Sequence, residues 1–368
     1  MNVLIQLSHP AHFHLYKNVA HNLIRDGHKV YILIKTKDIL EDLLKQYDLP
    51  YYNILDVAHR KSKLGIGLDM LLRDWKIMLF SIRHHIDLLT GSTPEVAQIG
   101  WLLRRHSIVV GEDDAPVVPA FQKVAGPFVE TLLTPVSCFN DKMESKSIKT
   151  ESYNELAYLH PHHFTPERRV VEKYFSTDTP YFILRFARLD AHHDDGIQGI
   201  NTEIATHLIE LLKPHGRIYI TSERELEPQF ESYRIRIRTM DMHHVMAFSS
   251  LYIGDSQTMA AEAAVLGIPF IRFNGFVGRI GYLNELENKY GLGYGIKTDN
   301  VEGLYAKVTE LLNLPNRKEI FQEKRKKLLS DKIDYASFLT WFIENYPESR
   351  DTMLENSDYQ YQFRDNRS

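Results

Sequence analysis

Residues 250–274 read SLYIGDSQTMAAEAAVLGIPFIRFN, and this stretch constrains the fold more than any other part of the chain. Its two ends, 251–253 and 268–273, are short apolar runs with β-branched residues, which are typical of buried strands. Between them, 258–266 is rich in Ala, Met and Leu, and predicts a helix that ends at Gly267. The stretch therefore predicts a strand, a turn, a helix and a second strand, as in a βαβ unit.

The turn Ser256-Gln257-Thr258 would open at the carboxyl end of a strand and at the N-terminus of a helix. Unpaired backbone N–H groups and the positive end of the helix dipole favour a phosphate at such a position. Glu262, about one helical turn further, would then reach the ribose hydroxyls of a nucleotide. The alternative is an ordinary crossover in which Asp255 or Ser256 only caps the helix.

The length of 368 residues predicts two domains, each with its own core. The composition is 43% hydrophobic and 25% charged, and the formal net charge of −4 argues against a nucleic-acid-binding surface. Cys138 is the only cysteine, which excludes an internal disulfide and fits a reducing cytosol. No stretch approaches the ~18 apolar residues of a membrane span. The chain opens directly on a strand-like segment, so we expect a cytoplasmic protein.

The rest of the chain alternates strands and helices in the same way. The expected strands are 3–7, 29–34, 51–54, 107–110 and 132–134, followed by 181–186, 217–221 and 234–237. The expected helices lie between them and continue to a last aromatic helix at 335–346, and residues from 348 onward have the composition of a frayed tail. Segment 137–152 is polar and irregular, and residues 90–94 are typical of a turn.

This order predicts an α/β protein with two Rossmann-like, doubly wound domains that face each other across a cleft. The expected domains are 1–160 on the acceptor side and 161–334 on the nucleotide-sugar side. A C-terminal helix in 335–368 would cross back to the first domain and continue into a polar tail.

Residues 61–87 combine basic and aromatic residues with a helical period, including Trp75 and Phe80. One interpretation is a solvated helix with a single face in the core. The other is a peripheral contact with a membrane surface.

Three histidines, His9, His12 and His14, crowd the turn after the first expected strand. Zinc requires three or four ligands in fixed geometry, and histidines two residues apart at a helix start point in different directions, so we expect no metal. A histidine here suits a general base, because its pKa lies near neutrality. His12 is the first candidate and His14 its rival; helix capping or packing is the alternative.

Acidic residues follow the expected strand 107–110, as Glu112-Asp113-Asp114. They are interpreted either as a solvated loop or as general acid/base carboxylates, with Asp113 and Asp114 as the catalytic candidates. The remaining histidine pairs, at 84–85, 162–163, 192–193 and 243–244, are interpreted as surface or loop residues. The chain has no Asp-x-Asp motif, which argues against a metal-dependent sugar transferase of that type.

Polar residues also follow the expected strands of the second half. Arg185 and Arg188 come at the end of the first of these strands, where they would suit a diphosphate. A structural salt bridge is the alternative. Ser222 and Glu223 follow the next strand and are expected to line the same site.

Five segments of the chain carry a resemblance to a known family: SHPAHFHLYKN, RDGHKV, TGSTPEVAQI, YNELAYLHP and GDSQTMAAEAAVLGIPFI. From Met1 to about Tyr294 the chain resembles the uncharacterised domain-of-unknown-function family 354. That family is placed among proteins of the glycosyltransferase B fold (GT-B), which has two Rossmann domains. The resemblance implies the fold more strongly than the reaction.

The last segment also resembles the D-S-G-G-x-x-x-E segment of nucleotide-sugar 2-epimerases, with Asp255, Ser256 and Glu262 in register. In those enzymes the serine and the following amides hold the diphosphate, and the glutamate holds the ribose. Gln257 and Thr258 replace the two glycines here. His12 matches the histidine of the Gly-Gly-His loop of related transferases, but no glycine precedes it.

The resemblance implies a metal-independent glycosyltransferase that uses a nucleotide-diphosphate sugar, such as a UDP sugar, as substrate and needs no cofactor. Its acceptor would be a glycan or a lipid-linked molecule, and its product a cell-surface or capsular polysaccharide made from the cytosolic side. A non-hydrolysing nucleotide-sugar 2-epimerase, with residues 112–114 as acid and base, is the second hypothesis. The third is a nucleotide-sugar-binding protein without catalysis.

Overall fold

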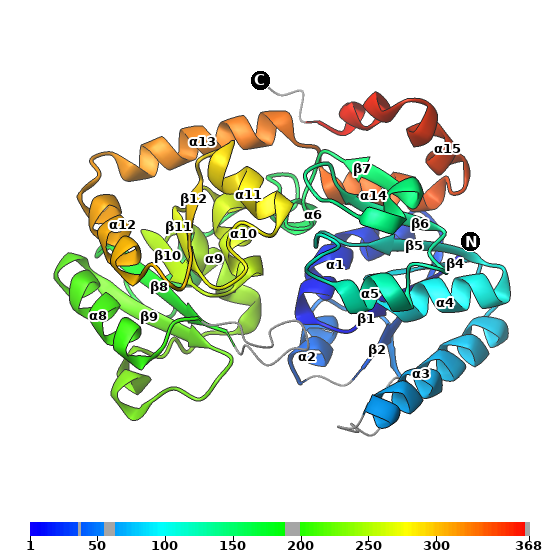
Figure 1. The fold of residues 1–368 in the computed structure, drawn as a ribbon, viewed down its shortest axis with the longest axis horizontal. Coiled ribbons are helices and arrows are strands. Elements are labelled where there is room, and N and C mark those ends of the chain that lie inside the picture. Colours follow the sequence, from blue (N-terminus) through cyan, green and yellow to red (C-terminus); the bar gives the residue numbers. More distant parts are fainter. Residues whose placement is uncertain (36–37, 55–62, 188–198, 365–368) are drawn as a thin grey trace. The chain divides into compact units, whose positions relative to one another are not determined.

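A computed structural model describes residues 1–35, 38–54, 63–187 and 199–364 (Figure 1). The chain divides into two compact units. The first unit is formed by Met1–Tyr158 and Lys332–Ser368, and the second unit by Leu159–Asp331.

The first unit is built on a seven-stranded sheet with the order β3-β2-β1-β4-β5-β6-β7, in which all paired strands are parallel. The strands are β1 (Asn2–Leu7), β2 (Lys29–Ile34), β3 (Tyr51–Asn53), β4 (Leu88–Gly91), β5 (His106–Val110), β6 (Thr131–Pro135) and β7 (Ser147–Thr150). The strand order reverses between β1 and β4. Ligands of doubly wound sheets bind at the carboxyl ends of the strands at such a point.

The helices of the first unit cover both faces of this sheet (Figure 1). They are α1 (Pro10–Arg25), α2 (Asp38–Gln46), α3 (Lys63–Arg83), α4 (Pro94–Leu103), α5 (Pro119–Val124), η1 (Asp141–Lys146), α6 (Leu156–Leu159), α14 (Tyr335–Glu344), α15 (Glu348–Glu355) and η5 (Ser357–Phe363). Three of them, α1, α4 and α5, begin with proline, whose fixed φ and missing N–H suit the first helical position.

The second unit contains a five-stranded parallel sheet with the order β12-β11-β10-β8-β9. Its strands are β8 (Tyr181–Phe186), β9 (Arg217–Ser222), β10 (Leu251–Gly254), β11 (Phe270–Phe273) and β12 (Gly293–Ile296). Its helices are α7 (Arg168–Val171), α8 (Thr202–Leu212), η2 (Lys213–His215), η3 (Pro228–Tyr233), η4 (Thr239–Asp241), α9 (Met242–Ala247), α10 (Gln257–Leu266), α11 (Gly281–Asn288), α12 (Val301–Asn313) and α13 (Arg317–Asp331). Here the strand order reverses between β8 and β10.

The two parallel sheets confirm the predicted α/β class with two Rossmann-like, doubly wound units. One expected strand, 234–237, is wrong. Only Arg234 forms an isolated bridge to Ile220, and the N–H of Ile235 donates to the carbonyl of Ile220 at 2.9 Å. The alternation of Ile and Arg in this segment is typical of a strand, but the Arg234 side chain pairs with Glu231 and the ladder ends there.

The elements missing from the sequence interpretation include β4, β7, β12 and α13. Residues 90–94 do contain a helix start, but Thr90 and Gly91 complete the buried strand β4. The segment 137–152, expected to be irregular, contains η1 and β7. Polar residues in β4 and β7 hide the burial of these two short strands from a reading of the sequence alone.

The expected frayed tail after residue 348 is also wrong, because this segment packs on the first unit. Met353 is 3% exposed and Gln360 is 2% exposed. The Gln360 side-chain oxygen accepts the N–H of Glu151 at 2.7 Å, and the Tyr359 ring stacks on Trp341 with centroids 4.7 Å apart. Apolar and aromatic residues within a polar composition therefore order this segment.

Within the described ranges, no helix is both long and apolar enough to cross a bilayer.

We expect Met353→Ala to lower the free energy of unfolding by about 2–5 kcal/mol, because it removes a buried side chain. Leu354→Ala is the matched control, since Leu354 is 56% exposed and its loss should change stability by no more than about 0.5 kcal/mol. Denaturant unfolding of both variants measures the difference. Equal stabilities would mean that the segment after 348 does not pack in solution.

Candidate functional site

Asp255 lies at the point where the strand order of the second sheet reverses, directly after β10. Its carboxylate accepts the N–H of Ala187 at 2.6 Å and the N–H of Ile200 at 3.3 Å. The side chain is buried, and this burial raises the pKa of the carboxyl to about 6. Asp255 thus anchors both ends of the connection between β8 and α8, and does not cap α10.

Ser256 caps α10, since its hydroxyl accepts the N–H of Met259 at 3.4 Å. Among the described residues of the second unit, the N–H groups of Gln257 and Thr258 have no hydrogen-bond acceptor. They lie at the positive end of the helix dipole, where an anion is stabilised. The structure therefore places the predicted turn at a helix start with two amide donors.

Glu262 lies inside α10 and is buried, with its Oε1 2.9 Å from Nε2 of His243 on α9. His243 is 5% exposed, so its expected place on the surface is wrong. The sequence contains no signal for this pair, because the two residues come from different helices. The contact fixes the direction of the Glu262 carboxylate.

Arg185 is the last residue but one of β8, and its guanidinium is turned toward β9. It donates to Oγ1 of Thr221 at 2.9 Å and forms an ion pair with Glu223. Ser222 instead bonds within its own loop, where its hydroxyl donates to the carbonyl of Arg224 at 2.7 Å. Arg188 lies outside the described residues. The structure thus brings Arg185 and Glu223 together, and in this arrangement the guanidinium of Arg185 is paired with the carboxylate of Glu223.

Gly254 makes room for this arrangement at the end of β10. A Cβ there would lie 2.6 Å from the hydroxyl of Tyr252 and 2.7 Å from Cβ of Arg185. Both contacts are too close for real atoms, so a side chain at position 254 would push Arg185 or Tyr252 away. This strand end requires glycine although it holds no glycine-rich loop.

Asn274 is a residue of this site that the sequence interpretation missed. It follows β11, its side-chain amide donates to the carbonyl of Asp255 at 2.9 Å, and its side-chain oxygen accepts the N–H of Phe276 at 3.0 Å. A polar residue directly after a buried strand was the available signal. Next to it, Arg272 is fully buried and pairs with Glu287 at 2.9 Å.

In the first unit, the turn after β1 holds the three expected histidines at the reversal point between β1 and β4. His9 caps α1, since its Nδ1 accepts the N–H of Ala11 at 3.2 Å. His14 is 8% exposed, and its ring packs against Phe13 and Tyr158. His9 therefore caps α1, and His14 packs against neighbouring aromatic rings.

His12 is half-buried, and its Nδ1 lies 3.4 Å from both the N–H and the hydroxyl of Ser8. When Nδ1 accepts the Ser8 N–H, the proton of the neutral ring is on Nε2, and Nε2 is a donor. When Nδ1 instead donates to the Ser8 hydroxyl, Nε2 becomes a base. The contact with Ser8 is therefore coupled to the position of the proton on His12.

The acidic segment after β5 separates into three different environments. Glu112 is half-buried and accepts the N–H of Asn154 at 3.2 Å; burial and the nearby charge of Asp113 raise its pKa to about 8. Asp113 is exposed. Asp114 is buried and accepts the N–H of Phe139 at 2.9 Å, which is a structural role. Burial therefore favours the protonated form of Glu112.

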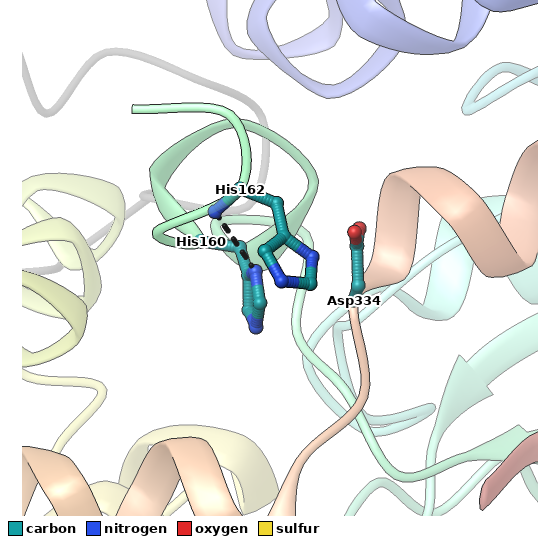
Figure 2. Close-up of side chains that lie close together, drawn as sticks. All are labelled: His160, His162 and Asp334. Atoms are coloured by element: carbon teal, nitrogen blue, oxygen red, sulfur yellow. Dashed lines mark hydrogen bonds between the residues drawn. The ribbon is translucent and has the colours of Figure 1, made fainter. Parts of the chain in front are cut away.

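Two further histidines, His160 and His162, lie at the start of the second unit (Figure 2). Nδ1 of His160 accepts the backbone N–H of His162 at 3.3 Å, and the ring centroids are 4.5 Å apart. Asp334, also drawn in Figure 2, belongs to the first unit. There it caps α14 by accepting the N–H of Ser337 at 3.1 Å.

No protein-family model and no curated protein matches the chain, so the resemblance to family 354 stays a prediction. Solved structures do match. S. aureus MnaA, solved with UDP, has a TM-score of 0.68 at 11% identity, over 95% of this chain and 97% of that one. The UDP-GlcNAc 2-epimerase from Neisseria meningitidis, bound to UDP-GlcNAc, has a TM-score of 0.59 at 15% identity, over 89% and 98%.

A glycosyltransferase has the same fold. The spinosyn rhamnosyltransferase SpnG, complexed with thymidine diphosphate, has a TM-score of 0.60 at 12% identity, over 94% of this chain and 100% of that one. At these identities the similarity defines the fold class: the chain has the two-Rossmann GT-B fold that nucleotide-sugar epimerases and glycosyltransferases share.

We expect Glu112→Gln to change how stability depends on pH. The folded state raises the pKa of Glu112 from 4.5 to about 8, so the folded protein binds the proton more tightly than the unfolded chain. The contribution of Glu112 to the free energy of unfolding is therefore fully present below pH 4.5 and is lost as the pH rises toward 8. At pH 9 the glutamine variant should be more stable than the parent protein by about 1–3 kcal/mol.

Denaturant unfolding of both proteins between pH 5 and 9 measures this difference, within the window of about 4.5 to 8 that the pKa shift defines. Parallel stability curves for the two proteins would show that Glu112 is ionised throughout and would remove it as an acid.

Proposed function

We propose that the protein acts on a nucleotide-diphosphate sugar and binds its diphosphate in the second unit, at the start of α10. The observation that carries this proposal is the pair of amide donors of Gln257 and Thr258 at the point where the strand order reverses. The fold supports it, since proteins of this fold have been solved with UDP, thymidine diphosphate and UDP-GlcNAc.

The neighbouring side chains give the rest of the nucleotide a place in this proposal. The Glu262 carboxylate, held by His243, would accept hydrogen bonds from the ribose hydroxyls. Arg185 would exchange its ion pair with Glu223 for the diphosphate, which offers the guanidinium more charge. Asp255 would keep the loop after β8 in position.

The reaction proposed first is metal-independent glycosyl transfer to a glycan or lipid-linked acceptor, from the cytosolic side, in the synthesis of a cell-surface or capsular polysaccharide. Catalysis would consist mainly of positioning and of stabilising the leaving diphosphate by amides and cations. His12 would take the proton of the acceptor hydroxyl at Nε2, in the tautomer that donates from Nδ1 to the hydroxyl of Ser8; Nδ1 would then give up the N–H of Ser8 that it accepts here. Asp113 would orient the acceptor or the imidazole.

A specific observation favours nucleotide-sugar 2-epimerisation as a second candidate. Glu112 keeps its proton near neutral pH, because burial raises its pKa to about 8. Epimerisation requires a group that gives a proton to carbon and another that removes one, and a half-buried acid beside the carboxylate of Asp113 suits this chemistry. In both proposals Asp114 has no catalytic role, because its carboxylate accepts the main-chain N–H of Phe139.

We expect Gln257→Pro to weaken UDP binding about 10- to 100-fold, since it deletes one amide donor to a charged group. Proline fits this position, because Gln257 is the first residue of α10 and Ser256 before it has the extended backbone that precedes proline (φ −81°, ψ 128°). Gln257→Ala is the matched control, as it removes the side chain and keeps the amide. Calorimetry measures both affinities, and circular dichroism checks the fold.

Equal UDP affinity of the proline and alanine variants would place the diphosphate elsewhere. Glu262→Ala tests the ribose part of the site separately, with an expected loss of about 1–3 kcal/mol.

The two reactions are separated by supplying UDP sugars with and without acceptors, in the presence of EDTA. A transferase consumes the donor only with an acceptor, and His12→Ala should lower its kcat about 10²- to 10⁴-fold with near-normal UDP affinity. An epimerase changes the donor alone, and Glu112→Gln should then have the larger effect. Loss of activity in EDTA would contradict the metal-independent reaction, and UDP binding without any turnover would identify a binding protein.

A further inference from the structure

Helix α3 of the first unit carries a row of exposed apolar side chains, here called the α3 stripe. Its exposed fractions are 46% for Leu68, 62% for Leu71, 37% for Leu72, 56% for Trp75, 44% for Leu79 and 54% for Ile82. These positions recur every three or four residues, so they share one helix face. In Figure 1, α3 runs along the margin of the first unit beside α4.

The opposite face of α3 is anchored in the unit, so the stripe cannot turn inward. Ile77 is fully buried and Ser81 is 3% exposed. Nε of Arg73 lies 2.9 Å from Oε1 of Glu95, which ties α3 to α4. The helix therefore has a core face of its own, and the six exposed side chains form a second apolar face.

The charges around the stripe are mainly positive. Arg83 is exposed and Lys76 is half-buried on the same helix. The two acids of the described part of α3 add little negative charge to this surface. Asp69 is 5% exposed, and burial together with Glu95 raises the pKa of Asp74 to about 7. The surface that surrounds the stripe therefore complements a negative partner.

The neighbouring helix α4 has a similar composition at its C-terminal end. In the last turn of α4, Trp101 is 61% exposed and Leu102 is 54% exposed. Arg104 and Arg105 follow the helix and are both exposed. Exposed Trp and Leu next to Arg is the composition of a surface that rests in the headgroup region of a membrane.

A second copy of the chain is a less suitable partner. Leu68, Leu72, Trp75, Leu79 and Ile82 have the four–three spacing of a coiled-coil seam. A paired coil, however, places opposite charges beside its seam. The positions on one side here are Lys76 and Arg83, and those on the other side are Leu71 and Met78. An identical helix would therefore offer these cations no acidic partner.

We propose that the α3 stripe is a docking surface for an anionic phospholipid bilayer. Its apolar side chains would enter the boundary between headgroups and acyl chains, and Lys76 and Arg83 would contact lipid phosphates. This inference stands independently of the nucleotide site, which is built from the second unit. It makes the protein a peripheral membrane protein.

The test is sedimentation of the full chain with vesicles of phosphatidylcholine alone or mixed with phosphatidylglycerol. We expect binding to the mixed vesicles, and at least a tenfold loss of binding in the double variant Leu71→Gln with Trp75→Gln. Arg83→Gln should weaken binding to the mixed vesicles about fivefold, the contribution of one cation near an anionic surface. Leu354→Gln, which changes an equally exposed leucine on α15, is the matched control and should bind normally.

Three results would overturn the proposal. One is the absence of sedimentation with the mixed vesicles. Another is equal binding to both lipid compositions with no effect of Arg83→Gln. The last is a dimer in analytical ultracentrifugation that the double variant converts to a monomer, because the stripe would then be an interface between copies. UDP affinity, measured in the same preparations, shows separately whether each variant keeps its nucleotide site.

Discussion

The arrangement of the second unit depends on one buried carboxylate, that of Asp255. Its two oxygens accept main-chain N–H groups from both sides of the connection after β8, while its own carbonyl accepts the side-chain amide of Asn274 after β11. One residue therefore links the carboxyl ends of three adjacent strands. Because these ends hold the start of α10 in place, the amides of Gln257 and Thr258 keep a fixed direction without a glycine-rich loop. The cost of burying the carboxylate appears as its raised pKa.

Periodic segments of the fold could be predicted from the sequence, and two strands, 29–34 and 181–186, were predicted with the bounds that the structure shows. Elements without a clear period were missed. Thr90 and Gly91 are typical of a turn, yet they end a strand that is buried on both faces. The segment after 348 is polar in composition, but a few apolar and amide side chains, such as Met353, are enough to pack it. Burial of single residues in short elements is set by tertiary contacts, which composition does not contain.

The candidate site was predictable where it depends on the local chain. It was not predictable where it depends on contacts between side chains of different elements. The helix start at 256–258 follows from the strand–helix order around it. The partner of Glu262 is His243, and the partner of Arg185 is Glu223. Nothing in the sequence links the residues of these pairs, because they come from different elements. The state of Glu112 likewise depends on the main chain of Asn154 and on burial.

The first unit consists of two separate pieces of chain, and this affects how the protein can fold during its synthesis. α14 packs on α1, where the side-chain amide of Asn22 donates to the hydroxyl of Thr340 at 3.2 Å. The second unit is continuous in sequence and is synthesised completely before α14 is made. Domains generally fold as units during translation. The face of α1 that receives α14 therefore remains uncovered while the second unit already has its complete sequence. The first unit, although it begins the chain, is thus the last to complete its fold.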